Sequence, residues 1–350
     1  MNIISPINSL GYGVAGLNIV KAMSELETVA LWVVGNPEVT TQQDADIIRK
    51  ALGEAAIPKF DDPCLRIWHQ HDMSQFVGKG MHIGFPFFEL DKFREQEKLH
   101  LNHLDRLFVS SQWAKDVAKE QLFLKETDIR VAPLGVDSEV FKPVDLKEEE
   151  KTIFLNCGKW EIRKGHDILV NMFSKAFEID DDVELWMMTN NPFLTEKEDS
   201  EWKKMYLNSK LGDKIKFIDR QTTHEEVYNI MCKTTCGVFP SRAEGWNLEL
   251  LEMMSCGKQV IATNYSAHTE FCDNDNAMLV EIGELEPAYD GKWFHGKCGS
   301  WAKITNTEQD IIIDMLRAVH ANHRFNKEGV ETGKQFSWRN TAKSILSNAK

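Results

Sequence analysis

The sequence has 350 residues, of which 42% are hydrophobic and 27% charged; this composition is typical of a globular protein, and the length predicts two domains. The formal net charge of −13 disfavours nucleic acid as a partner, because Lys and Arg hold such partners through their phosphates. There is no run of about 18 apolar residues, and the N-terminus lacks the pattern of a signal peptide. We therefore expect a cytoplasmic protein without a transmembrane segment.

Short apolar runs rich in β-branched and aromatic residues alternate with amphipathic stretches in the first part of the chain. Such alternation predicts a parallel sheet covered by helices. The predicted strands are residues 29–34, 65–68, 81–85, 107–109 and 129–132. The charged stretch 145–151 follows them and predicts a domain boundary after residue 144.

A second series of the same kind begins after this boundary and predicts a second doubly wound domain. Its predicted strands are residues 152–157, 183–188, 215–218, 236–239, 259–262 and 277–280, with a helix at 166–177 between the first two. Residues 283–301 show no clear period and are interpreted as a long loop or insertion. Two helices, 308–322 and 338–348, are expected to close the chain.

The stretch 239–252 contains the most informative pattern, in which a strand runs into a loop and then into a helix. Such a loop lies at the carboxyl edge of a doubly wound sheet, where ligands bind, and the helix N-terminus offers N–H groups to phosphate or sugar oxygens. Asn247 is a candidate N-cap of this helix. Glu244 and Glu252 can accept hydrogen bonds from hydroxyl groups. The alternative is that Glu249 and Glu252 are solvated charges near a helix start.

A basic loop, residues 156–165, directly follows the first strand of the second series. Gly158 permits close backbone approach to a ligand, and Lys159, Arg163 and Lys164 can neutralise a diphosphate leaving group. The alternative for a basic loop of this size is solvated surface.

Together these motifs resemble the retaining GT-B glycosyltransferases of family GT4, the glycosyl transferases group 1. The resemblance rests on Gly158-Lys159 with Lys164-Gly165, on Glu244 followed eight positions later by Glu252, and on the small-residue run 255–263. The segment 133–137 with Phe141, and Phe336-Ser337-Trp338 before the last helix, also match. The similarity covers about residues 80–350 well and the first third of the chain loosely.

The resemblance implies a role for each matching position. Lys159 and Lys164, with Arg163 and Gly158 beside them, would hold the donor diphosphate, and Glu252 would hold the ribose. Glu244 would hold the transferred sugar, together with the backbone that follows it. That backbone comprises Gly245, Trp246, Asn247 and Leu248. Lys159 departs from the family, which more often has Arg there, so a fork-like contact becomes a point-charge contact.

Two candidate positions lie in the first domain. The segment 11–16, with the pattern GxGxxG, is expected to be a loop before a helix at 17–23, and the family carries a glycine-rich loop there, so Gly13 is a candidate donor contact. A dehydrogenase is disfavoured, because no acidic residue follows the strand 29–34 to hold a ribose. Glu89, in an aromatic-Glu pair resembling part of the family, is a candidate catalytic carboxylate facing the sugar; the alternative is a Glu at a helix start.

Metal and disulfide chemistry are not expected. The seven cysteines form no CxxC pair, the cluster His69-Gln70-His71-Asp72 offers few ligands, and the acidic triplets at 180–182 and 273–275 are interpreted as surface turns.

The fold class predicted is α/β, namely GT-B with two doubly wound Rossmann-like domains facing across a cleft. Residues 1–144 are expected on the acceptor side and residues 145–333 to bind the nucleotide-sugar, while the helical segment 334–350 crosses back to the first domain. The predicted function is metal-independent sugar transfer with retention of configuration, in which Glu89, Lys164 and Glu244 are the catalytic candidates. No cofactor is expected, because the nucleotide-diphosphate sugar is a substrate. The acceptor, whether a sugar, a lipid-linked group, a protein or another molecule, stays open.

Two other functions remain as alternatives. A nucleotide-sugar epimerase shares this fold and would need no acceptor. A GT-B module that binds without catalysis is the other, although Lys159, Lys164, Glu244 and Glu252 are all present in the sequence.

Overall fold

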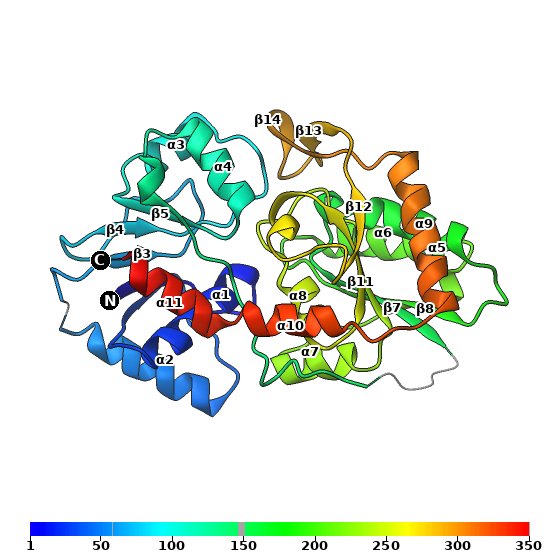
Figure 1. Cartoon of the computed structure of the whole chain (residues 1–350), viewed down its shortest axis with the longest axis horizontal. Coiled ribbons are helices and arrows are strands. Elements are labelled where there is room, and N and C mark those ends of the chain that lie inside the picture. Colours follow the sequence, from blue (N-terminus) through cyan, green and yellow to red (C-terminus); the bar gives the residue numbers. More distant parts are fainter. Residues whose placement is uncertain (58, 146–150, 350) are drawn as a thin grey trace. The chain divides into compact units, whose positions relative to one another are not determined.

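The computed structural model describes residues 1–57, 59–145 and 151–349 of the chain (Figure 1). These residues form two compact units. Unit 1 contains Met1–Gly135 with Phe336–Lys350, and unit 2 contains Val136–Gln335. Of the charged stretch 145–151 at the expected boundary, residues 146–150 lie outside the described residues.

Unit 1 is built on a six-stranded parallel sheet with the strand order β2-β1-β3-β4-β5-β6. Its strands are β1 Asn2–Ser5, β2 Ala30–Val33, β3 Cys64–Arg66, β4 His82–Gly84, β5 Arg106–Val109 and β6 Ile129–Val131. Its helices are α1 Gly11–Ser24, α2 Gln42–Glu54, α3 Glu95–Leu101, α4 Gln112–Gln121, the 3-10 turn Glu126–Asp128, and α11 Trp338–Asn348. The strands are short apolar runs whose side chains are largely buried, which is expected when helices cover a parallel sheet.

The glycine-rich segment 11–16 differs from the expectation of a loop before a helix at residue 17. Helix α1 already begins at Gly11, so the glycines occupy its first turns. A Cβ atom at Gly13 would lie 2.2 Å from the side-chain oxygen of Asn8, and one at Gly16 would lie 2.1 Å from the hydroxyl of Ser5. The glycines therefore let the helix start pack closely on the end of β1, and the loop interpretation was wrong.

Helix α11 packs on α1 within unit 1. Its first residue, Trp338, approaches Gly135 so closely that a Cβ atom at Gly135 would lie 2.2 Å from the Trp338 backbone nitrogen. Ser337 caps this helix by accepting a hydrogen bond from the Asn340 backbone N–H at 3.3 Å. The segments around residues 135 and 338 are thereby fixed to one another.

Unit 2 contains the second six-stranded parallel sheet, with the strand order β12-β11-β10-β7-β8-β9. Its strands are β7 Thr152–Gly158, β8 Val183–Thr189, β9 Ile215–Phe217, β10 Cys236–Phe239, β11 Gln259–Asn264 and β12 Met278–Glu281. Its helices are α5 His166–Ala176, α6 Glu196–Leu207, α7 His224–Met231, α8 Leu248–Ser255, α9 Asn306–Ala321 and α10 Lys327–Gln335, with 3-10 turns at Ile162–Lys164, Gly212–Lys214 and Ser266–Glu270.

The core of unit 2 joins α5 and α9 to the central strands. Phe173 of α5 and Leu316 of α9 pack in one buried cluster with Leu185 and Met187 of β8. The connections from β7 to β8 and from β10 to β11 run in opposite directions across the sheet, so right-handed crossovers place α5 and α8 on opposite faces. The predicted doubly wound α/β class is therefore confirmed for both units.

Residues 283–301 are not the loop that was expected. They form most of an antiparallel hairpin, β13 Leu285–Tyr289 and β14 His295–Ala302, with an irregular register between Pro287 and Tyr289. This hairpin is largely exposed, so its strands lack the apolar signature of the buried ones. Helix α10 was also missed, because it is short and contains two glycines.

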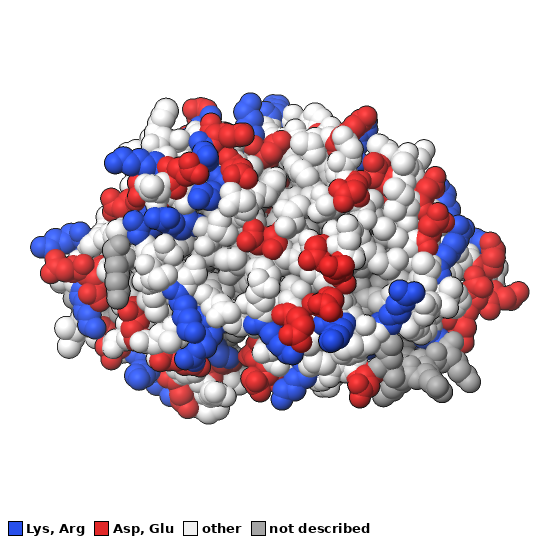
Figure 2. All heavy atoms as spheres, viewed as in Figure 1, with Lys and Arg blue, Asp and Glu red and all other residues white. Residues whose placement is uncertain are grey.

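Charges of both signs are interspersed over the face in Figure 2, where Lys and Arg side chains lie among Asp and Glu side chains. Throughout the parts of the chain that the structure describes, none of the helices combines the length and apolarity that a membrane crossing demands.

Candidate active site in unit 2

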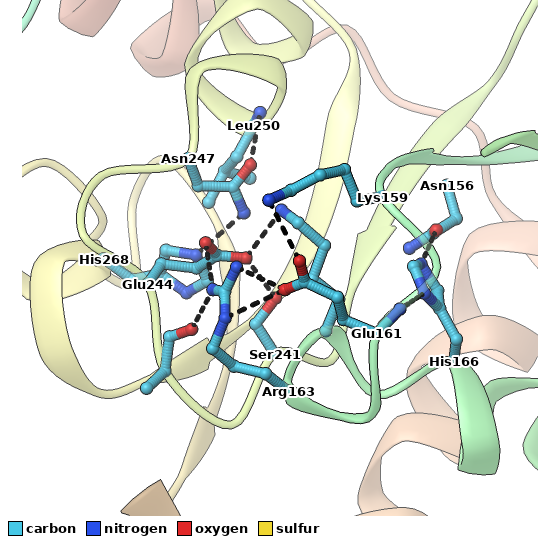
Figure 3. Close-up of polar contacts among 12 residues, drawn as sticks. Asn156, Lys159, Glu161, Arg163, His166, Ser241, Glu244, Asn247, Leu250 and His268 are labelled. Atoms are coloured by element: carbon cyan, nitrogen blue, oxygen red, sulfur yellow. Dashed lines mark hydrogen bonds and ion pairs between the residues drawn. The ribbon is translucent and has the colours of Figure 1, made fainter. Parts of the chain in front are cut away.

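The candidate site lies where β7 and β10 end side by side in the middle of the unit 2 sheet. The chain leaves β7 towards β8 on one side and leaves β10 towards β11 on the other, so this is the topological switch point of the sheet. Ligands of open α/β sheets bind at such a point, outside the carboxyl ends of the strands. The loops after these two strands, residues 159–165 and 240–247, carry most of the predicted site residues (Figure 3).

Two glycines shape the basic loop after β7. Gly158 has φ of 126° and Gly165 has φ of 76°, values that side-chain-bearing residues rarely adopt. A Cβ atom at Gly165 would also lie 2.1 Å from the carbonyl oxygen of Pro240. The loop can therefore turn back against the β10 loop only with glycine at this position.

The carboxylate of Glu244 is the centre of a buried network (Figure 3). One oxygen accepts a hydrogen bond from Lys164 Nζ at 2.9 Å and one from Ser241 Oγ at 2.9 Å, and the other accepts one from Arg163 at 2.7 Å. The Glu244 backbone N–H donates to Ser266 Oγ at 2.8 Å. Both loops are thus tied together through one side chain, which is only 4% exposed.

The charges of this network stabilise each other against burial. Burial alone would raise the pKa of Glu244, but Arg163 and Lys164 hold that pKa far below its ordinary value. The pKa of Lys164 is raised above its ordinary value; burial opposes the rise, and the neighbouring carboxylates of Glu244 and Glu249 outweigh it. Glu244 and Lys164 are therefore both ionised at neutral pH.

Glu161 forms a second carboxylate bridge within the basic loop. One of its oxygens accepts from Arg163 Nε at 3.1 Å and from an Arg163 terminal nitrogen at 2.7 Å, while the other lies 3.1 Å from Lys159 Nζ. Arg163 also donates to the Ala243 carbonyl at 2.6 Å. Its guanidinium is therefore committed to protein oxygens on several sides, and it braces the two loops against each other.

A buried histidine supports the loop from below. His166 Nδ1 accepts from the Glu161 backbone N–H at 3.1 Å, so Nε2 carries the proton and donates to Asn156 Oδ1 at 2.8 Å. Asn156 in turn donates to the Val238 carbonyl of β10 at 2.7 Å. Burial lowers the pKa of His166 to about 3, so this histidine stays neutral and its tautomer is fixed.

The start of α8 forms the other side of the site. Asn247, with φ of 87°, caps the helix by accepting from the Leu250 backbone N–H at 3.3 Å, which confirms the predicted cap. Its amide also lies 2.9 Å from His268 Nε2. The helix N-terminus is thus fixed next to Glu244, with Gly245, Trp246 and Leu248 in the connecting backbone.

Glu252 lies one turn further along α8 and differs from Glu244. Its side chain is buried, at 8% exposure, yet within the described residues its carboxylate has no hydrogen bond or ion pair. Burial, followed by the nearby charge of Glu249, raises the pKa of Glu252 well above its ordinary value. A buried carboxylate without a partner is costly to a folded protein unless a ligand supplies one.

The remaining two predicted site residues, Gly13 and Glu89, belong to unit 1. Glu89 is half-buried and its charge acts on Tyr12, whose hydroxyl exchanges hydrogen bonds with the Phe87 backbone at 2.8 and 3.0 Å. The roles of both residues stay predictions.

Several residues of the network were not foreseen. Glu161 stands inside the basic loop but was given no role, and Ser241, Ser266 and His268 carry no motif of their own. Their contribution arises from tertiary contacts. For Glu161 the sequence did hold a signal, because a carboxylate between three cations is a natural ion-pair partner.

The side chains of the cluster His69-Gln70-His71-Asp72, which follows β3, contact one another and the protein. Asp72 pairs with Arg66 at 2.9 Å, and the His69 and His71 rings stack on each other with centroids 5.2 Å apart. Over the described part of the chain, no three His, Cys, Asp or Glu side chains are grouped so that they could hold a metal ion.

Comparison with protein families finds a match within the second unit. Residues 151–290 match the sequence model of the family described as "Glycosyl transferases group 1". This segment contains both loops of the site and helix α8.

Curated relatives are distant. The phosphatidylinositol N-acetylglucosaminyltransferase GPI3 subunit of Saccharomyces cerevisiae is 23% identical over 188 residues, which are 52% of this chain and 40% of that protein. The mannosylfructose-phosphate synthase of Agrobacterium fabrum is 24% identical over 272 residues, 70% of this chain and 59% of that protein. The matched part thus spans about half the length of these two relatives.

Solved structures share the fold over nearly the whole chain. The sucrose-phosphate synthase from Thermosynechococcus elongatus has a TM-score of 0.72 at 16% identity, with 99% of this chain and 97% of that chain covered. HepE from Anabaena, solved in complex with UDP-glucose, has a TM-score of 0.68 at 14% identity, with 99% and 98% covered. At such identities the likeness shows the fold alone, which is that of GT-B glycosyltransferases.

Proposed function

We propose that this chain, whose residues 151–290 match the glycosyl transferases group 1 (GT4) and which has the GT-B fold, transfers a sugar from a nucleotide-sugar donor to an acceptor with retention of configuration. One observation carries this proposal. At the switch point of the unit 2 sheet, a cationic loop and a helix N-terminus lie beside Glu252, a buried carboxylate that has no hydrogen bond or ion pair among the described residues.

Each part of this site suits one part of a nucleotide-sugar. Lys159 and Lys164 supply positive charge for the diphosphate, and the first N–H groups of α8 are oriented as in other anion sites. Glu252 accepts hydrogen bonds from the two ribose hydroxyls, which gives its carboxylate the partners that it does not have among the residues the structure describes. We assign the hydroxyls of the sugar to Glu244 and to the backbone after it.

The chemistry follows from charge stabilisation and positioning. As the bond between the sugar and the diphosphate breaks, negative charge grows on the leaving phosphate, and Lys164 is already fixed nearby by Glu244. Of the carboxylates at the site, those of Glu161 and Glu244 are held by cations, and that of Glu252 is assigned to the ribose. We therefore favour attack from the face on which the nucleotide leaves, with the donor phosphate accepting the acceptor proton.

A ligand screen followed by product analysis tests this function. UDP-glucose is the first donor to try because HepE was solved with it, and GDP-, ADP- and dTDP-sugars complete the panel. Binding of the true donor is expected to raise the melting temperature by mass action. Mass analysis then separates the alternatives: an epimerase alters the donor without acceptor, a binding module leaves it intact, and a transferase consumes it in the presence of an acceptor.

Metal removal provides a second check on the same proposal. Two lysines and a helix N-terminus supply the positive charge, so transfer is expected to continue in EDTA. Strict dependence on added Mn²⁺ or Mg²⁺ would contradict the proposed leaving-group chemistry.

A further inference from the structure

The cations of the basic loop are already neutralised by the protein. Glu161 and Glu244 together form ion pairs with Lys159, Arg163 and Lys164 at distances between 2.7 and 3.1 Å. Within these ion pairs, two carboxylates against three cations leave one net positive charge. A diphosphate that enters this loop therefore meets carboxylates as well as cations.

The three cations differ in how accessible they are. The side chains of Arg163 and Lys164 are 5% and 10% exposed, whereas that of Lys159 is 38% exposed. Lys159 Nζ also lies 5.7 Å from the ring centroid of the half-exposed Phe193. Lys159 is therefore the cation of the loop that a ligand can reach without dismantling the buried network.

The two oxygens of Glu161 perform separate tasks. One oxygen holds Arg163 through two hydrogen bonds, and the other holds Lys159. The Arg163 contacts are buried and brace the loop, but the Lys159 contact is at the solvent side of the pair. Loss of the second contact alone leaves the brace intact.

We propose that Glu161 is an internal counter-ion that holds Lys159 and yields it to the donor diphosphate. Glu161 thereby weakens the binding of nucleoside diphosphate, which favours release of that product after transfer. This inference rests on the proposed function, since it assigns Lys159 to the diphosphate. A carboxylate that competes with a bound anion limits affinity through like-charge repulsion.

If the role of Glu161 were purely structural, its substitution would change the affinity for the anion in the opposite direction. If its one task were to brace Arg163, any substitution would loosen the loop and weaken anion binding. Glu161→Gln distinguishes the two, because the amide oxygen can still accept from Arg163 while the amide NH₂ group releases Lys159.

Calorimetric titration of inorganic diphosphate and of UDP into the variants provides the test. Glu161→Gln is expected to bind inorganic diphosphate about three- to tenfold more tightly than the wild type, as expected for release of one partly exposed ion pair. Lys159→Gln is expected to bind it more weakly and to abolish the effect of Glu161→Gln in the double variant. Turnover of Glu161→Gln is expected to show stronger inhibition by the nucleoside diphosphate product.

Glu184→Gln is the matched control. Glu184 is likewise buried and paired with two cations, here Lys151 and Lys216 at 2.9 and 2.8 Å, but it lies at the amino end of strand β8, whereas the site lies at the carboxyl ends of the strands. This variant is expected to leave the affinity for diphosphate unchanged.

The outcomes separate the inference from the function on which it rests. The inference is overturned if Glu161→Gln binds inorganic diphosphate no more tightly than the wild type does, or if Lys159→Gln binds it as tightly as the wild type. This holds even if nucleotide-sugars are turned over. Absence of any nucleotide-sugar binding or turnover, alongside the predicted response to inorganic diphosphate, overturns the proposed function and leaves the counter-ion in place.

Discussion

Glu244 and Glu252 are buried almost equally, at 4% and 8% exposure, but the protein treats their charges in opposite ways. Two cations and a hydroxyl surround Glu244, whose pKa is far below its ordinary value. Glu252 has no such partner among the described residues, and its pKa is raised. The protein itself thus supplies the partners of the Glu244 carboxylate, whereas the described residues supply none to the carboxylate of Glu252 on α8.

This difference separates preorganisation from ligand binding. A carboxylate that positions lysine and arginine side chains belongs to the fold as much as to the site, because these charges require it when buried. A carboxylate without partners lowers the stability of the empty protein and gains them from a ligand. Substitutions at the two positions are therefore expected to have different consequences for stability and for binding.

Glu244→Ala is expected to have the largest effect. It leaves Arg163 and Lys164 buried with one carboxylate fewer, which costs about 3–5 kcal/mol in the free energy of unfolding. Chemical denaturation at pH 7 measures this loss. The comparison between the regions fails if Glu244→Ala unfolds at the wild-type denaturant concentration.

Lys164→Ala tests the chemical step. Loss of one fixed cation from a preorganised site is expected to lower kcat by about 100-fold. Single-turnover kinetics at saturating donor measure the step itself, and Lys151→Ala, at an ion pair with Glu184 in the same unit, serves as control. Full activity of Lys164→Ala would show that Lys164 takes no part in the chemical step.

Glu252→Gln is expected to separate binding from stability. Donor affinity falls by roughly 1.5–3 kcal/mol, because the ribose hydroxyls lose a charged acceptor. The free energy of unfolding at pH 7 stays equal or rises, since a buried carboxylate without a partner has been removed. Calorimetry with donor measures the affinity, and denaturation without donor measures the free energy of unfolding. A stability loss as large as that of Glu244→Ala would show that Glu252 has partners within the protein.

The pH dependence of stability sharpens the same contrast. An unfolded chain loses the Glu252 proton near pH 4.5, while the folded chain keeps it until a higher pH because its pKa is raised. The wild type therefore loses stability relative to Glu252→Gln as pH rises above about 4.5, by up to about 1.4 kcal/mol per pH unit, until the folded pKa is passed. Denaturation of both proteins between pH 4.5 and 8 measures this, and parallel curves would refute the raised pKa.

The sequence predicts the regions whose signals are local. Strand β10 and helix α11 have the bounds expected of them, because a short buried apolar run and a capped amphipathic stretch are legible without tertiary structure. The hairpin β13–β14 was missed since its exposed strands lack that pattern. The glycines of α1 were misplaced into a loop because their reason, close packing on Asn8 and Ser5, lies in three dimensions.

The candidate site divides in the same way. Motif spacing singled out Lys159, Lys164, Glu244 and Glu252, and the structure brings the first three into one network of the loops beside α8. Which carboxylate each cation contacts was beyond sequence reasoning, since Glu161 and Glu244 are separated by 83 positions and meet through Arg163. Gly13 and Glu89 stay predictions of unit 1.

The most direct test asks whether unit 2 binds a nucleotide-sugar through Glu252 of α8. It is a calorimetric titration of UDP-, GDP-, ADP- and dTDP-sugars into the wild type and into Glu252→Gln. One donor is expected to bind the wild type and to lose at least about tenfold in affinity with Glu252→Gln, in keeping with one charged hydrogen-bond acceptor removed. Equal affinity of that donor for both proteins, or no binding of any of the four to the folded wild type, would contradict the proposed site.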